Sequence, residues 1–258
     1  NFAASLYYYM PNRLHFQSSM EMCGGDIVSS FYGSVYYFIW KSLVYDNLET
    51  PSNTYLRMWS TTSDLASGGE TYNVWGGIRN AYLLLENIDK VPDATEEEKK
   101  MIEGQLYFFR AWWHFELINW FGGLPYIDIA FEGNEDLQIP RLTYQECADK
   151  AAADFRKAAD LLPINWDNTD AGKATFNKND LRINKVMALA YLGKCYLWAS
   201  SPLMEHGAEV GGANTYNYNK EYAQKAADAF GELLALVESG QTQYALAEFN
   251  YTDIYNHT

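Results

Sequence analysis

Residues 96–125 read EEEKKMIEGQLYFFRAWWHFELINWFGGLP, and this stretch carries the strongest structural signal in the chain. Its acidic opening follows Thr95 and places negative charge at the positive end of a helix dipole. Apolar residues then recur every three or four positions, as Ile102, Leu106, Phe109, Trp113, Leu117 and Trp120, with Phe108, Trp112 and Phe115 on a second face. A helix that is apolar on two faces is buried on two sides. The Gly-Gly-Leu-Pro segment at residues 122–125 ends it.

The same helical period recurs along the rest of the chain. We expect further helices at about residues 72–90, 143–162, 180–200 and 219–239, and two rich in tyrosine within residues 1–20 and 30–45. Thr143 and Glu146 have the spacing of a capping box, and Gly240 closes the last helix as a C′ glycine. Strand signals are sparse, with one short extended piece expected at Tyr126–Phe131.

Polar loops join these helices, at about residues 46–71, 126–142, 163–179 and 201–218. Antiparallel helices connected in this way predict an all-α fold of tetratricopeptide-like helix-hairpin repeats with long loops. The helix starts are unevenly spaced and the tetratricopeptide consensus is not visible, so the repeat geometry is predicted without a repeat sequence. We expect a single domain over residues 1–258.

The composition excludes several classes of function. The 258 residues include 19 Lys and Arg against 33 Asp and Glu, which gives a net charge of −14. Such a chain repels a phosphate backbone and an anionic lipid surface, so we expect no nucleic-acid partner. No apolar run approaches the roughly 18–20 residues of a membrane span. Cys23, Cys147 and Cys195 lack CxxC spacing, which argues against a disulfide framework and a zinc site, and the last two are expected as buried thiols.

No catalytic constellation can be assembled from the sequence. The motifs G-x-S-x-G, G-x-G-x-x-G and H-E-x-x-H and the P-loop are absent. The four histidines are scattered, and we expect His114 to be structural. The stretch Asp167–Gly172 lacks Asp or Asn at the third and fifth positions of a calcium loop, so a solvated turn is preferred. We expect no metal and no cofactor, while a carboxylate pair for glycoside hydrolysis stays open as the enzymatic alternative.

Aromatic residues in the polar loops indicate a binding function. They are Tyr55, Trp59, Tyr72, Trp166, Tyr216 and Tyr218. An exposed aromatic ring covers the apolar C–H face of a sugar, while neighbouring polar groups bond the hydroxyls at its rim. The stretch 55–64 supplies both kinds of group, and its candidate ligand-binding residues are Tyr55, Arg57, Trp59 and Asp64. The alternative, with equal weight, is that Trp59 packs under its own loop.

Several blocks of the sequence resemble one protein family. Residues 75–88, WGGIRNAYLLLENI, are similar to the first tetratricopeptide-type helix of SusD/RagB-like proteins. Residues 104–117, GQLYFFRAWWHFEL, and FGGLP at 121–125 resemble the family's most recognisable motif, an LRA-type helix that runs into aromatic-Gly-x-x-Pro. The likeness continues through Arg141–Thr143 and covers about residues 70–200.

This resemblance implies a binding protein, not an enzyme. Such proteins are lipoproteins at the outer membrane of Gram-negative bacteria, face outward from the cell surface, and capture oligosaccharide, or in some branches peptide, for a SusC-like TonB-dependent transporter. In starch-binding members, a Trp in the loop before the first repeat helix joins an arc of aromatic residues. The resemblance therefore implies ligand contacts for Trp59 and Asp64, whereas Tyr55 and Arg57 rest on the loop composition alone.

The resemblance also bears on the extent of the chain and on its alternatives. Family members continue into a long C-terminal half, so we expect the N-terminal helical portion of a longer protein, with its lipid anchor outside this chain. The alternatives are a protein that captures peptide or glycopeptide, a mainly structural transporter subunit and, least favoured, an α/α glycoside hydrolase. Residues assigned to packing and helix–helix hydrogen bonds are Asn80, Asn87, Arg110, Trp112 and Trp113.

Overall fold

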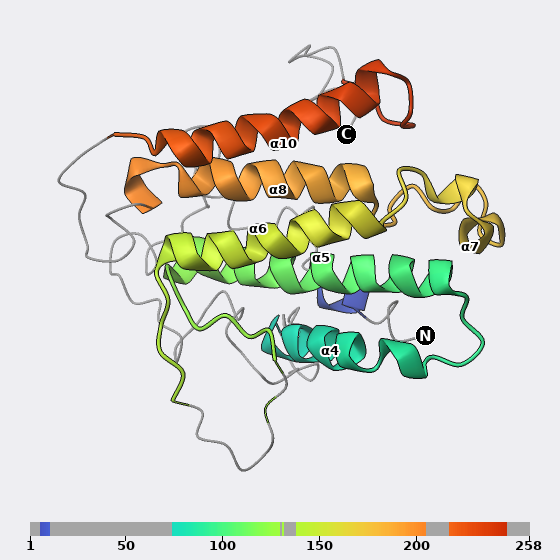
Figure 1. Cartoon of the computed structure of the whole chain (residues 1–258), viewed down its shortest axis with the longest axis horizontal. Helices are drawn as coiled ribbons and strands as arrows, with labels where there is room; N and C mark the ends of the chain where they lie inside the picture. Colours follow the sequence, from blue (N-terminus) through green and yellow to red (C-terminus); the bar gives the residue numbers. More distant parts are fainter. Residues whose placement is uncertain (1–5, 11–73, 130, 132–137, 205–216, 247–258) are drawn as a thin grey trace, which may run out of the picture. The chain divides into compact units, whose positions relative to one another are not determined.

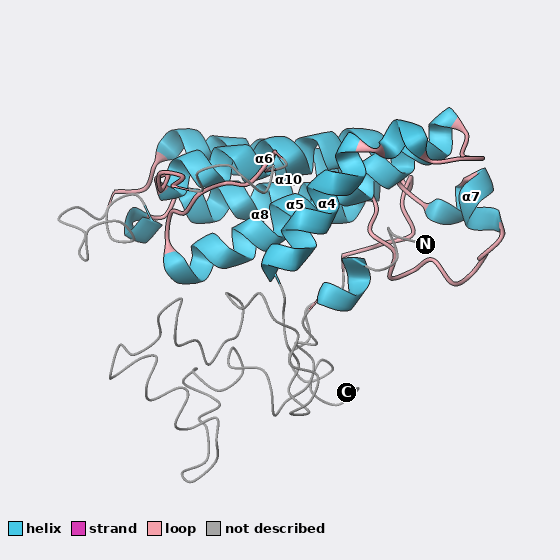
Figure 2. Cartoon of the chain, turned by 90° about the horizontal axis from the view of Figure 1, so that it is seen from below, coloured by secondary structure: helices cyan, strands magenta, loops and turns pink. Residues whose placement is uncertain are grey.

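The computed structural model describes residues 6–10, 74–129, 131, 138–204 and 217–246, and every regular element within them is a helix (Figure 1, Figure 2). The all-α fold predicted from the sequence is confirmed. The described residues fall into two compact units, one drawn from residues 1–87 and 127–138 and the other from residues 88–126 and 139–258. The expected single domain over the whole chain stays a prediction.

The first unit is built on helix α4, Val74–Glu86. Ile78 and Ala81 are buried three residues apart, on one face of the helix. The 3-10 helix η1, Leu6–Tyr9, packs against α4, and the side chain of Leu6 is fully buried. This turn is what the structure describes of the helix expected within the first twenty residues, and the helix expected within residues 30–45 lies outside the described part.

The second unit opens with the 3-10 helix η3, Ile88–Lys90, and the long helix α5, Glu96–Phe121. Thr95 caps α5, because its hydroxyl accepts a hydrogen bond from the Glu98 amide at 3.2 Å while the Glu98 carboxylate accepts one from the Thr95 amide at 2.8 Å. The helix ends at Gly122, where φ is 72°, a conformation that suits glycine. Both predicted apolar faces of α5 are buried, as seen at Leu106, Phe108, Phe109, Trp112, Trp113, Phe115 and Leu117.

Arg141 joins the end of α5 to the start of the next helix. Its guanidinium donates hydrogen bonds to the carbonyl oxygens of Phe121, at 2.7 Å, and of Gly123. Carbonyl groups at a helix C-terminus have no partner within the helix, so a basic side chain stabilises them. This contact gives a structural reason for Arg141 to accompany the Phe-Gly-Gly-Leu-Pro segment in the sequence.

Three further long helices follow: α6, Tyr144–Leu161; α8, Lys185–Ala199; and α10, Lys220–Glu238. The predicted capping box of Thr143 is confirmed, and Gly240 has the predicted left-handed conformation, with φ of 68°. Helix α8 begins at Lys185, not near residue 180, because Asn184 caps it by accepting a hydrogen bond from the Met187 amide at 3.0 Å.

The long helices pack in chain order, α5 on α6, α6 on α8 and α8 on α10, as antiparallel neighbours (Figure 1). This arrangement confirms the predicted helix-hairpin geometry. Small residues allow the close approach: the buried face of α6 carries Ala148, Ala151, Ala158 and Ala159. Between α8 and α10, Gly193 lies directly against the ring of Phe230.

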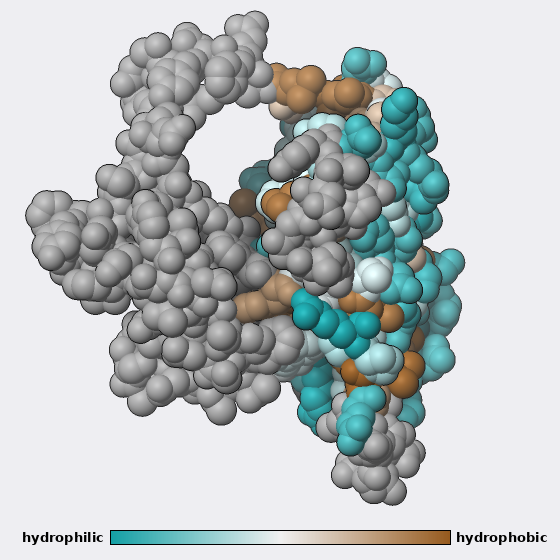
Figure 3. All heavy atoms as spheres, turned by 90° about the vertical axis from the view of Figure 1, so that its left-hand side faces the viewer, coloured by the Kyte–Doolittle hydropathy of each residue, from teal (hydrophilic) through white to brown (hydrophobic). Residues whose placement is uncertain are grey.

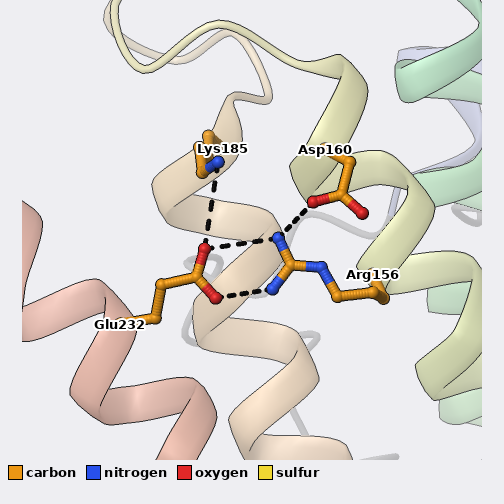
Figure 4. A network of polar contacts seen from close by, with 4 residues as sticks. All are labelled: Arg156, Asp160, Lys185 and Glu232. Carbon is orange, nitrogen blue, oxygen red and sulfur yellow. Dashed lines mark hydrogen bonds and ion pairs between the residues drawn. The ribbon is translucent and has the colours of Figure 1, made fainter.

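A network of charged residues links α6, α8 and α10 (Figure 4). Arg156 of α6 contacts Asp160 on the same helix at 2.6 Å and Glu232 of α10 at 2.6 Å. Lys185 of α8 approaches the other oxygen of Glu232 at 3.8 Å. Because these side chains are partly exposed, the network contributes on the order of 1 kcal/mol and mainly fixes how the helices are aligned.

The loop between α6 and α8 is folded, with the 3-10 helix η4, Trp166–Asn168, and the short helix α7, Asp170–Lys173. The side chain of Asn179 donates hydrogen bonds to Asp167 Oδ1 at 2.6 Å and to the Gly172 carbonyl at 3.0 Å. Asp167 therefore accepts a hydrogen bond within its own loop, which agrees with the turn that the sequence favoured over a calcium loop.

The segment after α5 corrects one expectation. Residues 126–129 form a loop, not the short extended piece expected at Tyr126–Phe131. The side chain of Tyr126 turns into the helical core and donates a hydrogen bond to Asp154 at 3.0 Å. A tertiary contact, not strand pairing, therefore sets the conformation of this segment.

Candidate functional site

The ligand-binding residues predicted from the sequence lie outside the described residues: Tyr55, Arg57, Trp59 and Asp64. Two of the other aromatic residues of the polar loops, Tyr72 and Tyr216, lie outside them as well. All six positions stay predictions. A site within the described structure has to come from the helices and from the loops between them.

Trp166, another of the loop aromatics, belongs to the core and not to a ligand surface. Its side chain is 1% exposed, and its indole Nε1 donates a hydrogen bond to the Ile183 carbonyl at 2.8 Å. The guanidinium carbon of Arg182 lies 3.6 Å from the centre of the indole. Trp166 thus anchors the loop between α6 and α8, while Tyr218, in the next loop, is 67% exposed.

A buried polar cluster joins α5 to α6. The Arg110 guanidinium donates two hydrogen bonds to the Asp154 carboxylate, at 2.7 and 2.8 Å. The ring of His114 stacks on Tyr126 with a centroid separation of 3.8 Å, and its Nδ1 lies 2.8 Å from the Arg110 carbonyl oxygen. Burial and the neighbouring Asp154 carboxylate raise the pKa of Tyr126 well above its usual value. These contacts confirm the structural roles expected for Arg110 and His114.

The two described thiols are also structural. Cys147 and Cys195 are fully buried, and the Cys147 Sγ lies 3.0 Å from the Leu124 carbonyl oxygen. Burial raises the pKa of the Cys195 thiol, which keeps it protonated and poorly nucleophilic. Among the described residues, no group of three or more His, Cys, Asp or Glu side chains could hold a metal ion. In the same ranges, no helix has the length and apolarity that crossing a bilayer requires.

A continuous series of aromatic rings leads from the core to the surface near the end of α8. Phe108 and Phe155 each contact Tyr191, with ring centroids 5.5 and 5.8 Å apart. Tyr191 in turn meets Phe115 at 6.5 Å, and Phe115 meets Trp198 edge to face at 6.2 Å. Trp198 is 39% exposed. The buried rings hold its indole in place at the surface, which lowers the entropy cost of binding a ligand there.

Lys194 lies among the outermost rings of this series. Its Nζ is 5.7 Å from the ring centroids of Tyr191 and Trp198 and 6.0 Å from that of Phe115. Lys194 and Trp198 stand four residues apart, on one face of α8. We call Lys194 and Trp198, with the rings of Phe115 and Tyr191 beside them, the Trp198 surface.

A second group of rings nearby is already satisfied by its own chain. The Tyr222 hydroxyl donates a hydrogen bond to Asp149 at 2.9 Å, and burial together with this bond raises the pKa of Tyr222. Lys225 lies 4.9 Å from the Tyr222 ring centroid and pairs with Glu221 at 2.8 Å. Tyr196 completes the group, 6.0 Å from Tyr222. This group joins α6, α8 and α10. Because the Tyr222 hydroxyl and the Lys225 ammonium already bond carboxylates of the chain, they are less suited to bind a ligand.

Exposed apolar side chains gather where α8 ends and α10 begins. They are Leu197, Trp198, Leu203 and Tyr218. Figure 3 views the molecule from this side, and hydrophobic residues lie among hydrophilic ones in the part that is drawn in colour. A Trp ring beside an ammonium group can cover the C–H face of a sugar and bond a polar group at its rim. The Trp198 surface is therefore the described region best suited to a small polar ligand.

The sequence interpretation missed this surface for a specific reason. The sequence interpretation assigned ligand-binding rings to the polar loops, whereas Trp198 lies in a predicted helix, where an aromatic residue with apolar neighbours is usually part of a core. The spacing of Lys194 and Trp198 was the available signal, since a lysine one turn before an aromatic residue places charge and ring on one face. The exposure of Trp198 follows from tertiary packing, which the sequence alone does not give.

Comparison with known proteins agrees with this architecture. The model of a SusD-like family, described as starch-binding and associating with the outer membrane, matches residues 33–197, more than half of the chain. No curated protein sequence matches.

Solved structures show the same fold. A SusD-like protein from Bacteroides fragilis is similar with a TM-score of 0.63 and 19% identity, over 90% of this chain and 37% of the other. A SusD superfamily protein from Bacteroides thetaiotaomicron gives a TM-score of 0.63 and 14% identity, over 95% and 48%. A laminarin-binding SusD-like protein gives a TM-score of 0.51 and 23% identity, over 71% of this chain and 33% of the other.

This chain therefore spans less than half the length of these solved proteins. The family match and the shared fold cover the blocks on which the resemblance rested, including the α5 motif and its capping Arg141. The chain belongs to the SusD-like family.

Proposed function

We propose that this chain is the glycan-binding helical part of a cell-surface SusD-like protein, which captures oligosaccharide and delivers it to a SusC-like TonB-dependent transporter. The observation that carries this proposal is the match of residues 33–197 to a family described as starch-binding and associating with the outer membrane. One protein of the same fold is described as laminarin-binding, which favours a glycan over a peptide as the ligand.

The proposed ligand contacts come from the loop at residues 55–64. Trp59 and Tyr55 supply rings, while Arg57 and Asp64 supply groups that bond sugar hydroxyls. Covering ~80 Å² of one ring face stabilises a complex by roughly 2 kcal/mol at ~25 cal/mol/Å². Two such faces reach about −4 kcal/mol, which corresponds to a Kd near 1 mM. Tight binding therefore requires several rings.

The proposed role is capture without catalysis. Three buried titratable groups of the described structure, Arg110, Asp154 and Tyr126, bond one another inside the helical unit. We place the protein at the outer membrane, facing outward as a lipoprotein, with membrane contact only through an anchor outside this chain. The family's association with the outer membrane supports this location.

Titration of the purified chain with starch- and laminarin-derived oligosaccharides tests the ligand. We expect saturable changes in tryptophan fluorescence, no hydrolysis products, and loss of binding in Trp59→Ala with an unchanged circular dichroism spectrum. Phe176→Ala is the control, since it removes an exposed ring in the loop between α6 and α8. Binding of peptides alone would favour a peptide-capturing protein, and released sugars would indicate a hydrolase.

Affinity purification from outer membranes tests the proposed transporter. We expect the protein to co-purify with a large β-barrel whether or not a glycan is present. Glycan binding without such a partner would refute the delivery step and leave the capture step intact.

A further inference from the structure

The environment of Lys194 differs from that of the paired lysines in the described structure. Lys99, Lys173 and Lys225 each pair with a carboxylate one turn away on their own helix, at 2.9, 2.5 and 2.8 Å. Within the described ranges, no carboxylate lies at ion-pair distance from Lys194, although the chain has 33 acidic residues. Its ammonium instead lies within 6.0 Å of three ring centroids. Among the described residues, the half-buried Lys194 is thus a cation that lies beside rings and not beside a carboxylate.

This arrangement prepares the ammonium group for an anionic partner. The three rings fix the side-chain stem, so less rotational freedom is lost when a ligand binds. Aromatic faces attract the cation but accept no strong hydrogen bond, so the N–H donors of Lys194 remain available. A carboxylate satisfies those donors with charge-assisted bonds, which are roughly twice as strong as neutral ones.

The end of α8 does not cancel this charge. Helix C-termini carry partial negative charge on their last carbonyl groups. Here Ser200 caps α8, since its amide donates to the Tyr196 carbonyl at 2.9 Å and its hydroxyl donates to the Leu197 carbonyl at 2.6 Å. The Asn219 amide donates to the Ser200 carbonyl at 2.9 Å. These hydrogen bonds weaken the negative charge that the end of α8 presents to Lys194.

We propose that the Trp198 surface binds an acidic sugar, with the indole of Trp198 covering the C–H face of a uronic acid residue and Lys194 pairing with its carboxylate. The carboxylate carbon is bonded directly to the sugar ring, so a ring that covers the indole places its carboxylate at the rim. Lys194 Nζ lies 5.7 Å from the indole centroid, within reach of that rim. This proposal rests on the proposed function, because it names the class of glycan that the protein takes.

The test compares two forms of one ligand, trigalacturonic acid and its methyl ester, which share ring and linkage and differ in charge. By isothermal titration calorimetry at pH 7, we expect the wild-type chain to bind the acid at least about tenfold more tightly than the ester. Lys194→Met should abolish this preference. Lys178→Met, which removes the charge of an exposed lysine in the loop between α6 and α8, should retain it. Trp198→Ala should weaken the binding of both forms.

Equal affinity of the wild-type chain for acid and ester would overturn the proposal, as would equal behaviour of the two lysine variants. Laminari-oligosaccharides separate this outcome from failure of the proposed function. If they bind while the acid shows no advantage, only the acidic-sugar proposal fails. If no glycan of either kind binds, both fail. Loss of a co-purifying β-barrel in Trp198→Ala, with glycan affinity unchanged, would assign this surface to a protein partner and refute the sugar site.

Discussion

The packing of α8 against α10 allows the same substitution to be tested at two helical glycines with opposite expected results. Gly193 in α8 faces Phe230 of α10, and a Cβ atom added there would lie 2.5 Å from Cε1 and 2.7 Å from Cδ1 and Cζ of that ring. Gly231, one residue after Phe230, has open space, with no atom within 4 Å of an added Cβ. Both positions lie inside helices, so the gain in helix propensity is common to both.

The magnitudes follow from these distances. Replacing glycine by alanine within a helix stabilises it by about 0.8–1.0 kcal/mol. Carbon atoms pack best at about 3.5–4.0 Å, so the Phe230 ring must move by about 1 Å to admit a methyl group at position 193. Overpacking of this kind costs about 1–3 kcal/mol. Gly231→Ala should therefore raise the free energy of unfolding. The free energy of unfolding of Gly193→Ala should be about 1–3 kcal/mol lower than that of Gly231→Ala.

Urea unfolding followed by circular dichroism at 222 nm measures both values by linear extrapolation. The double variant Gly193→Ala/Phe230→Ala provides the control, because removing the ring removes the clash. In the Phe230→Ala background, Gly193→Ala should become stabilising, like Gly231→Ala. If the two single variants differ by less than about 0.5 kcal/mol, the close approach of α8 and α10 at Gly193 is wrong.

Three more substitutions test other contacts. Asp154→Asn removes the carboxylate charge that pairs with the buried Arg110 guanidinium and should lower the free energy of unfolding by about 3–5 kcal/mol in urea titrations. Arg141→Ala removes the bonds to the end of α5 and should cost about 1 kcal/mol in the same assay. Because the pKa of Tyr126 is raised in the folded state, its stabilisation is complete below pH ~10 and falls above it, by up to about 1.4 kcal/mol per pH unit. Tyr126→Phe should flatten this alkaline loss, and Tyr218→Phe should not; equal slopes would refute the assignment.

The elements that the sequence predicted well are those set by local patterns. Thr95 and Thr143 each precede a Glu at the third helical position, and both capping boxes form. Both apolar faces of α5 are buried as predicted, and α6 packs along this helix. The start of α8 was placed too early because residues 180–183 continue the helical pattern. Their conformation depends on Trp166, whose bond to Ile183 joins positions 17 residues apart in sequence.

In the candidate site, too, local patterns were predicted from the sequence and tertiary contacts were not. A polar stretch of sequence indicates a loop, but it does not tell whether a ring in that loop turns inward. Trp166 does so, and its indole N–H finds a carbonyl partner in the core. Trp198 lies in a helix and still reaches the surface, because the series of rings behind it fills the space where a core residue would lie. Exposure is a tertiary property, so neither outcome can be derived from neighbours in sequence.

The large aromatic content of the chain serves mainly to fill the core of the described helices. Aromatic residues make up 16% of the sequence, and those in the polar loops indicated a ligand surface. In the described helices, rings fill the core instead, and the fully buried ones include Phe108, Phe109, Trp113, Phe115, Tyr144, Phe155 and Trp166. Composition therefore reports on packing, and only rings with exposed area bear on binding. Trp198 meets that condition and stands beside Lys194, which has no carboxylate of the described residues at ion-pair distance. Geometry and charge, and not aromatic abundance, therefore support a glycan surface there.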